Sequence, residues 1–231
     1  MTEELKQITT ERGRIYTCGD KKYFSVTTPF KIIEAPPLEL WALKIGPEAA
    51  KRIATAAAGY GTGVHSVWEK ICKAEIATEA DIKKDVKKKY QEDSLKLLKW
   101  FNENVISVLH TEEKVRIDSI GVAGQLDTIC TVKTKDGPKL AVLDLKTGKI
   151  KAKAKMQMAA YRMGASETLG IPLEDITERV VLACNKKLKN AQAYYFGIDE
   201  DDWLAYVSLV NYYRWHVSEK GTVDKKEAKK H

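Results

Sequence analysis

The chain has 231 residues, a formal net charge of +7 and a sequence pI of about 9.0. It is long enough for one domain with a sizeable core, and its charge is compatible with a polyanionic partner without identifying one. No apolar stretch reaches the roughly 18 residues of a membrane span, the first four residues do not resemble a signal peptide, and the cysteines are scattered. We therefore expect a cytoplasmic protein in a reducing compartment, without membrane contact.

A single domain is expected over residues 1–222, and its first portion, residues 24–104, should be mainly helical. One helix should follow Pro36-Pro37. Another should occupy residues 47–58, because Gly59-Tyr60-Gly61 is a pattern that breaks helices.

His65 should open the next, short helix. Thr78 and Asp81 then have the spacing of a capping box, and an apolar stripe over residues 82–101 follows it. This pattern predicts one long helix that begins after Thr78 and ends near Asn104.

Residues 105–221 are expected to form the core of an α/β fold, a mixed central sheet flanked by helices. A helix around Gln157 should cross between a central hairpin and the later strands, and a last helix should begin near Asp199 and end by Gly221. Residues 223–231 should be a basic, disordered tail. Strands outside the hairpin are predicted at residues 105–109, 114–117, 179–184 and 193–196.

The most informative segment is the predicted hairpin, because it ends on charged residues. Residues 140–143 have the composition of a buried strand, and period-two alternation sends Asp144 and Lys146 out of the same face. The preceding strand carries Asp127, and Asp136-Gly137-Pro138 marks the turn, so symmetric pairing gives partner numbers that sum to 273. Asp127 would then face Lys146, and the two aspartates would be diagonal neighbours. One face of the preceding strand is expected to carry Val122, Leu126, Cys130 and Val132.

Two carboxylates that converge in this way can bind one divalent cation, and the lysine adds a positive charge beside them. A phosphodiester is a poor electrophile because its anionic oxygens repel hydroxide. Mg²⁺ or Mn²⁺ held by carboxylates neutralises that charge and lowers the pKa of bound water. A single aspartate at a strand end is most often a turn or cap residue, but the combination indicates a metal-dependent phosphodiesterase.

Four motifs occur in order at residues 61–69 (GTGVHSVWE), 124–127 (GQLD), 144–148 (DLKTG) and 157–161 (QMAAY). In this order they resemble the PD-(D/E)XK nuclease superfamily, and within it the RecB-type nuclease domains. The chain is also similar to CRISPR-associated RecB-like and mitochondrial genome maintenance exonucleases. The resemblance implies a restriction-endonuclease-like fold with an N-terminal helical portion.

The resemblance further implies a nuclease that uses one or two Mg²⁺ or Mn²⁺ ions. Relatives with an iron–sulfur cluster carry one early cysteine and three grouped late ones, whereas the cysteines of this chain are single, so no iron–sulfur cluster is expected. The implied metal ligands are His65, Asp127, Asp144 and the Leu145 carbonyl, and the implied catalytic residues are Lys146, Asp127, Asp144, Gln157 and Tyr161.

Four lysines between the expected site and the Gln157 helix lie where phosphates would have to pass, so we expect them to contact the DNA backbone. They are Lys149, Lys151, Lys153 and Lys155.

The predicted function is that of a DNA nuclease, and the similarity to exonucleases favours action on single-stranded ends. The resemblance implies a role in recombination, repair or replication. Many relatives are encoded by viruses or mobile elements, and a viral protein of this kind would be located in the host cytoplasm. The chain has no ATP-binding motif, so a helicase or recombination partner would be a separate protein. Two alternatives stay open, a non-catalytic module that binds DNA ends and a structural subunit of a nucleoprotein assembly.

Overall fold

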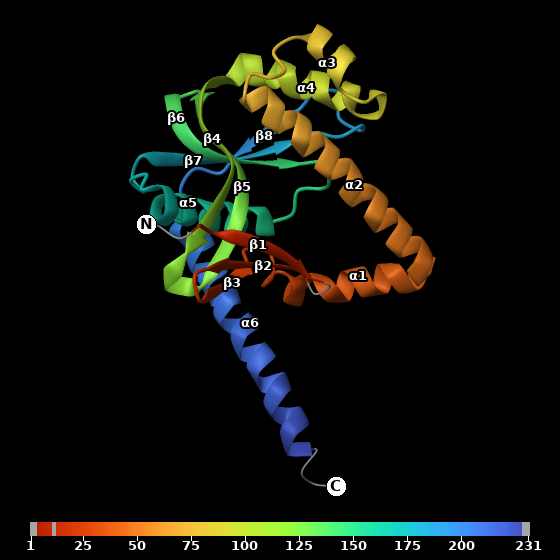
Figure 1. Cartoon of the computed structure of the whole chain (residues 1–231), viewed down its shortest axis with the longest axis vertical. Coiled ribbons are helices and arrows are strands. Elements are labelled where there is room, and N and C mark those ends of the chain that lie inside the picture. Colours follow the sequence, from red (N-terminus) through yellow and green to blue (C-terminus); the bar gives the residue numbers. More distant parts are fainter. Residues whose placement is uncertain (1–3, 11–12, 228–231) are drawn as a thin grey trace.

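The computed structural model describes residues 4–10 and 13–227, and its centre is an eight-stranded mixed sheet flanked by helices (Figure 1). The expected α/β class, a mixed central sheet flanked by helices, is confirmed. The strands are β1 (Lys6–Thr10), β2 (Gly13–Cys18), β3 (Lys21–Ser25), β4 (Val105–Ile117), β5 (Val122–Thr134), β6 (Gly137–Lys146), β7 (Ile176–Ala183) and β8 (Gln192–Tyr195). The helices are α1 (Lys31–Ile45), α2 (Pro47–Cys72), α3 (Glu79–Asp85), α4 (Lys88–Asn104), α5 (Lys153–Leu169) and α6 (Glu200–Glu227), with a 3₁₀ turn at Asp118–Ile120.

The strands follow the order β1-β2-β3-β5-β6-β7-β8, and β4 pairs with β5 outside this path. The first three strands were not predicted. They form an antiparallel meander, and β3 joins β5 in parallel register with Phe24 opposite Val122. Tyr16 and Tyr23 are buried, but most other positions of the meander are partly or fully exposed. Such an edge meander lacks a continuous apolar alternation that would mark it as sheet.

α2 runs without a break through the glycines that were expected to end a helix. A Cβ on Gly63 would lie 2.1 Å from the Tyr90 ring, and one on Gly61 would lie 3.3 Å from Thr147 Oγ1. These glycines therefore allow close contact with neighbouring elements rather than marking a helix end.

The start of α1 also differs from the prediction, because the helix includes Pro36-Pro37 instead of following them. The N–H of Glu34 already donates to the carbonyl of Phe30, whose side chain is buried beside Tyr206. The first turn is thus anchored before the prolines are reached.

The capping box of Thr78 and Asp81 is present, but the single long helix expected after it is wrong. Val86 has an extended backbone and separates α3 from α4. The side-chain amide of Gln91 donates to three carbonyls at the end of α3. These carbonyls would otherwise lack the N–H donors that the next turn of a continuous helix provides. The accepting carbonyls belong to Ile82, Lys83 and Val86.

β4 is one strand where two were predicted. Its pairing with β5 shifts between Val105 and Ser107 and again between Val108 and His110. Glu112 has a φ of +55°, a left-handed conformation that is uncommon for a residue other than glycine. The middle of the strand is polar and irregular, so the sequence pattern predicted two strands instead of one continuous strand.

The hairpin of β5 and β6 forms, but the predicted register is wrong. Thr134 pairs with Gly137 and Thr128 with Leu143, so partner numbers sum to 271 instead of 273. Gly137 has a φ of +105° and follows the two loop residues instead of being one of them. This positive φ is a conformation that favours glycine. The last pair of this ladder is Thr128 and Leu143. Asp127 and Asp144 directly follow it on the two strands, so the same register extended by one residue would place them opposite each other instead of on the predicted diagonal.

The single apolar face expected for β5 is also wrong. Val122 and Leu126 belong to a core shared with α5 and α6, whereas Cys130 and Val132 belong to a second core shared with α2, α3 and α4. Figure 1 shows these helices around the sheet. Because β5 is covered on both sides, apolar alternation cannot assign its faces.

α5 connects the parallel strands β6 and β7, as predicted for the Gln157 helix. α6 continues through Gly221 to Glu227 instead of ending by Gly221, because one glycine costs a helix only about 1 kcal/mol. Figure 1 shows α6 leaving the body of the protein. Residues 228–231 of the expected tail lie outside the described residues. Within the described chain, the helices are too short or too polar to span a bilayer.

Candidate active site

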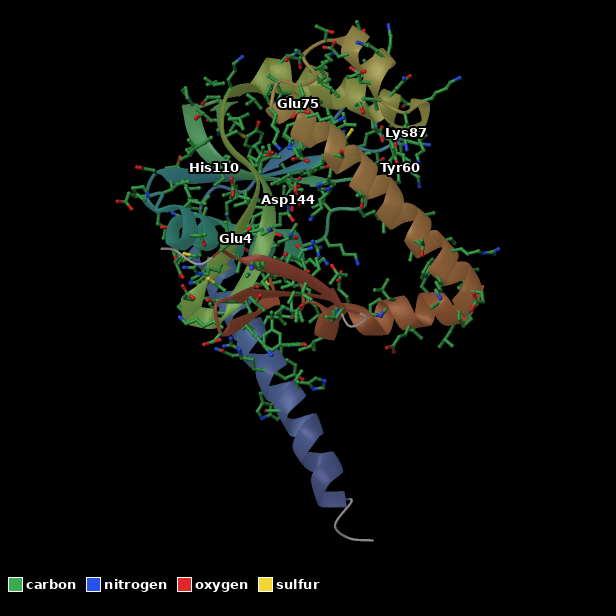
Figure 2. The ribbon with its side chains drawn as sticks, viewed as in Figure 1. Glu4, Tyr60, Glu75, Lys87, His110 and Asp144 are labelled. Atoms are coloured by element: carbon green, nitrogen blue, oxygen red, sulfur yellow. The ribbon has the colours of Figure 1, made fainter. Side chains whose placement is uncertain are left out.

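The paired ends of β5 and β6 open into a cavity of about 410 Å³ between the sheet, α2 and α5. Figure 2 shows Asp144 in the centre of the view, between the strands and α2. The structure brings six of the predicted site residues together in the wall of this one cavity. They are His65, Asp127, Asp144, Lys146, Gln157 and Tyr161.

Asp127 connects the two strands of the hairpin to α2. Its Oδ2 accepts a 2.6 Å hydrogen bond from the Leu145 N–H, and its Oδ1 lies 3.2 Å from His65 Nδ1. Burial disfavours the charged imidazole, but the hydrogen bond and charge of Asp127 outweigh burial and raise the pKa of His65. Asp127 therefore holds His65 beside the hairpin, where both side chains would bind the same metal ion.

Asp144 is buried and forms an ion pair with Lys146, whose Nζ lies 2.6 Å from Asp144 Oδ2. Oδ2 is buried, and the Lys146 ammonium is its polar neighbour among the described residues. Burial raises the pKa of Asp144, opposed by the Lys146 charge. Burial is the largest influence on Lys146 and lowers its pKa. The charge and hydrogen bond of Asp144, together with the charge of Asp127, outweigh burial, so the pKa of Lys146 lies above the usual lysine value.

Gln157 links these groups from α5. Its Oε1 accepts from Lys146 Nζ at 3.2 Å, and its Nε2 donates to Asp144 Oδ1 at 3.4 Å and to the Tyr161 hydroxyl at 3.3 Å. Tyr161 is buried, and a Cβ on Gly124 would lie 2.8 Å from its ring. The glycine of the 124–127 motif thus leaves room for the tyrosine of the 157–161 motif.

Sequence reasoning missed Glu112, which is the third member of a cluster of possible metal ligands with His65 and Asp127. One ligand atom from each residue lies within 4.8 Å of the others. Burial, followed by the charge of Asp127, raises the pKa of Glu112 to about 7. Gln125 donates a 2.7 Å hydrogen bond to its carboxylate. The one available signal was the polar break between the two strands predicted around it, at a backbone position whose φ is +55°.

Arg14 of β2 also lines the cavity and was missed, because the strand that carries it was not predicted. It lies close enough to Lys146 to oppose the protonation of that lysine. The cavity therefore contains two cationic side chains beside its carboxylates.

The four lysines predicted to contact DNA are not gathered at the site. Lys151 and Lys153 form ion pairs with Glu34 of α1, at 3.1 and 2.7 Å. Lys155 Nζ lies 5.7 Å from the centre of the Phe196 ring. Lys149 lines a separate, neighbouring cavity.

The donor set fits a hard divalent cation. Carboxylate oxygens from Asp127, Asp144 and Glu112 with one imidazole suit Mg²⁺ or Mn²⁺. The buried Asp144 carboxylate adds a negative charge to this cavity beside the Lys146 ammonium.

No protein-family model matches the chain, and no curated protein matches it. Among solved structures, it is similar to an alkaline exonuclease (LHK-Exo) from Laribacter hongkongensis, at 12% sequence identity and a TM-score of 0.39. The match covers 57% of this chain and 68% of that one. These values do not assign the chain to a family.

Proposed function

We propose that the protein is a metal-dependent deoxyribonuclease, an exonuclease that hydrolyses phosphodiester bonds at single-stranded DNA ends. The observation that carries this proposal is the meeting of Asp127, Asp144 and Lys146 in one cavity, where the buried Asp144 carboxylate forms an ion pair with Lys146. A role in recombination, repair or replication is part of the proposal. It is supported by the motifs that resemble RecB-type nucleases.

Asp127, Asp144, Glu112, His65 and the Leu145 carbonyl would hold one or two Mg²⁺ or Mn²⁺ ions. Bound there, such an ion supplies charge neutralisation at the phosphate and an acidified water. Lys146 keeps its proton because Asp144 lies beside it. Its ammonium can therefore donate to the attacking water or to a phosphate oxygen on which charge develops.

The supporting residues keep these groups in place. Gln157 holds Lys146 and Asp144 together, and the Leu145 N–H fixes the Asp127 carboxylate. Arg14 adds a guanidinium at the cavity wall, where it can bind an anionic phosphate oxygen. A site that is fixed in this way has little reorganisation to undergo when the charge of the transition state develops.

The test is digestion of end-labelled linear single-stranded DNA and of a closed single-stranded circle, with Mg²⁺, Mn²⁺ or EDTA. Wild type is compared with Lys146→Ala and with Lys89→Ala, a control that removes the same charge from a lysine outside the cavity. We expect degradation of the linear form alone, abolished by EDTA and by Lys146→Ala and retained in Lys89→Ala. Cutting of the circle would make the enzyme an endonuclease. No cleavage with either metal would overturn the proposal and leave a DNA-binding module or structural subunit.

A further inference from the structure

A second cavity of about 440 Å³ lies beside the candidate active site and has no part in the chemistry described above. We propose that it binds one unpaired nucleotide of a single-stranded nucleic acid. The base would lie on the ring of Tyr60, and the phosphate would be held by Lys149, Lys186 and Lys187. This inference rests on the proposed function, because it specifies which form of nucleic acid the neighbouring site receives.

The two cavities share a wall. On α2, Tyr60 lines the second cavity and the next residue, Gly61, lines the active site. At the end of β6, Lys146 lines the active site and the next residue, Thr147, lines the second cavity. Gly61 and Thr147 are in close contact, since a Cβ on the glycine would lie 3.3 Å from the threonine Oγ1. A nucleic-acid strand with one phosphate at Lys146 would therefore place a neighbouring nucleotide at this cavity.

Tyr60 is held as a rigid platform. Its hydroxyl donates a 2.7 Å hydrogen bond to Oδ2 of Asp93, a fully buried carboxylate whose Oδ1 accepts from Lys96 at 2.9 Å. The ring also packs against Tyr90, with centroids 5.3 Å apart. Neither the burial of Asp93 nor the orientation of this tyrosine is needed by the metal site. A fixed aromatic ring loses little conformational freedom on binding a base.

The charge of the second cavity suits a phosphate. Its described lining contains three lysines and no acidic side chain. Lys186 Nζ lies 5.2 Å from the centre of the Tyr60 ring, and this lysine side chain is exposed. A bound base would stack on this face of the Tyr60 ring, and the Lys186 ammonium would move from the ring to the phosphate.

A base inside a duplex is already stacked between its neighbours, so it must be unpaired and unstacked before it can place its face on the Tyr60 ring within a cavity. The cavity volume also falls within the range of about 300–1,000 Å³ that is common for small-molecule sites. The cavity therefore favours single-stranded over duplex nucleic acid.

Binding is measured in EDTA, which prevents metal-dependent cleavage, by fluorescence anisotropy of a labelled thymidine oligonucleotide and of an abasic strand of equal length. Wild type should bind the thymidine strand more tightly, and Tyr60→Leu should weaken that binding by about 5- to 150-fold, the effect of losing one base–aromatic stack. On the abasic strand, Tyr60→Leu and wild type should bind alike. Tyr60→Phe keeps the ring and should retain the preference for bases.

The lysines are tested by a matched pair. Lys186 and Lys89 both lie over tyrosine rings, at 5.2 and 4.7 Å, but only Lys186 lines the cavity. Lys186→Ala should reduce the slope of log affinity against log salt by about 0.7, the value for one phosphate contact on a single strand. Lys89→Ala should leave the slope unchanged.

Equal binding of thymidine and abasic strands by the wild type would overturn the cavity proposal, and this comparison does not depend on any variant folding. If the wild type then still degrades DNA with Mg²⁺ or Mn²⁺, the proposed nuclease activity stands without the nucleotide site. If binding depends on the base but no metal supports cleavage, the nucleotide site stands and the nuclease proposal fails.

Discussion

The main-chain N–H of Leu145 donates a 2.6 Å hydrogen bond to Oδ2 of Asp127. It joins the hairpin strands just beyond the ladder, whose last pair is Thr128 and Leu143. The other oxygen of Asp127 faces His65. Asp127 therefore combines a structural bond with a position in the proposed metal site.

These two roles of Asp127 can be separated. Asp127→Asn keeps a carbonyl oxygen for the Leu145 N–H but loses the charge, so we expect near-normal stability with cleavage reduced at least 100-fold. Asp127→Ala leaves the N–H without its acceptor and should also lower the free energy of unfolding by about 1–3 kcal/mol. Urea unfolding beside the cleavage assay measures both. Equal stability of the two variants would show that the Leu145 bond contributes nothing.

Gln157→Ala should reduce the cleavage rate and the Mn²⁺ affinity by about 10- to 100-fold, because the groups that orient a metal site matter nearly as much as its ligands. We assign the amide a positioning role, since it holds Lys146, Asp144 and Tyr161 by hydrogen bonds. Titration of Mn²⁺ by calorimetry gives the affinity independently of cleavage. Unchanged affinity and rate would contradict the assignment.

Glu112→Gln should stabilise the metal-free protein at high pH. The folded protein keeps the Glu112 proton up to a pKa of about 7, whereas the unfolded chain releases it near 4.5, so metal-free stability falls as pH rises between these values. The variant should gain about 1–2 kcal/mol at pH 8, after allowance for partial exposure, and nothing at pH 4. Urea unfolding in EDTA measures this, with Glu113→Gln as the neighbouring control. A gain of equal size at both pH values would contradict the explanation.

Gly124→Ala should be destabilising by about 1–3 kcal/mol, because its Cβ would lie 2.8 Å from the ring of buried Tyr161. The displaced ring should also disturb Gln157 and lower the cleavage rate. Gly59→Ala is the control, since a Cβ at this helical position meets no atom within 4 Å, and it should raise stability by up to about 1 kcal/mol. Thermal unfolding compares the two. Similar stabilities would show that the glycine is not required for packing.

Glu34→Gln should tighten binding of single-stranded DNA, because Lys151 and Lys153 would lose the carboxylate that now neutralises them. The salt dependence should steepen by about 0.7 for each lysine that reaches a phosphate. Glu39→Gln removes the same charge from an exposed position of α1 and controls for net charge. Anisotropy titrations over a salt series measure the slopes. Equal slopes for the two variants would show that Glu34 does not restrain these lysines.

The site residues that belong to short, continuous motifs could be predicted from the sequence. Asp144 and Lys146 are two residues apart on a strand, so alternation alone gives them one face. The partner of Asp144 could not be predicted, because the register depends on whether Gly137 lies within the turn or after it. Its φ of +105° settles that question only in the folded chain.

Glu112 and Arg14 show why the remaining residues could not be predicted. Glu112 reaches the metal cluster through a left-handed backbone position inside a strand, and no residue type in its neighbourhood requires that conformation. Arg14 reaches the cavity because a polar meander pairs with β5, which is a long-range contact without a local pattern. The helix break at Val86 likewise depends on a side chain, Gln91, from the next helix.

The parallel pairing of β3 with β5 determines how the chain can be divided. A fragment that begins at residue 105 would retain Asp127, Asp144 and Lys146, yet it would leave the backbone of β5 open beside Val122 and Ala123. An open strand edge in the middle of a sheet invites pairing with other chains. Attempts to isolate the acidic hairpin without residues 13–25 should therefore yield aggregates rather than a minimal domain.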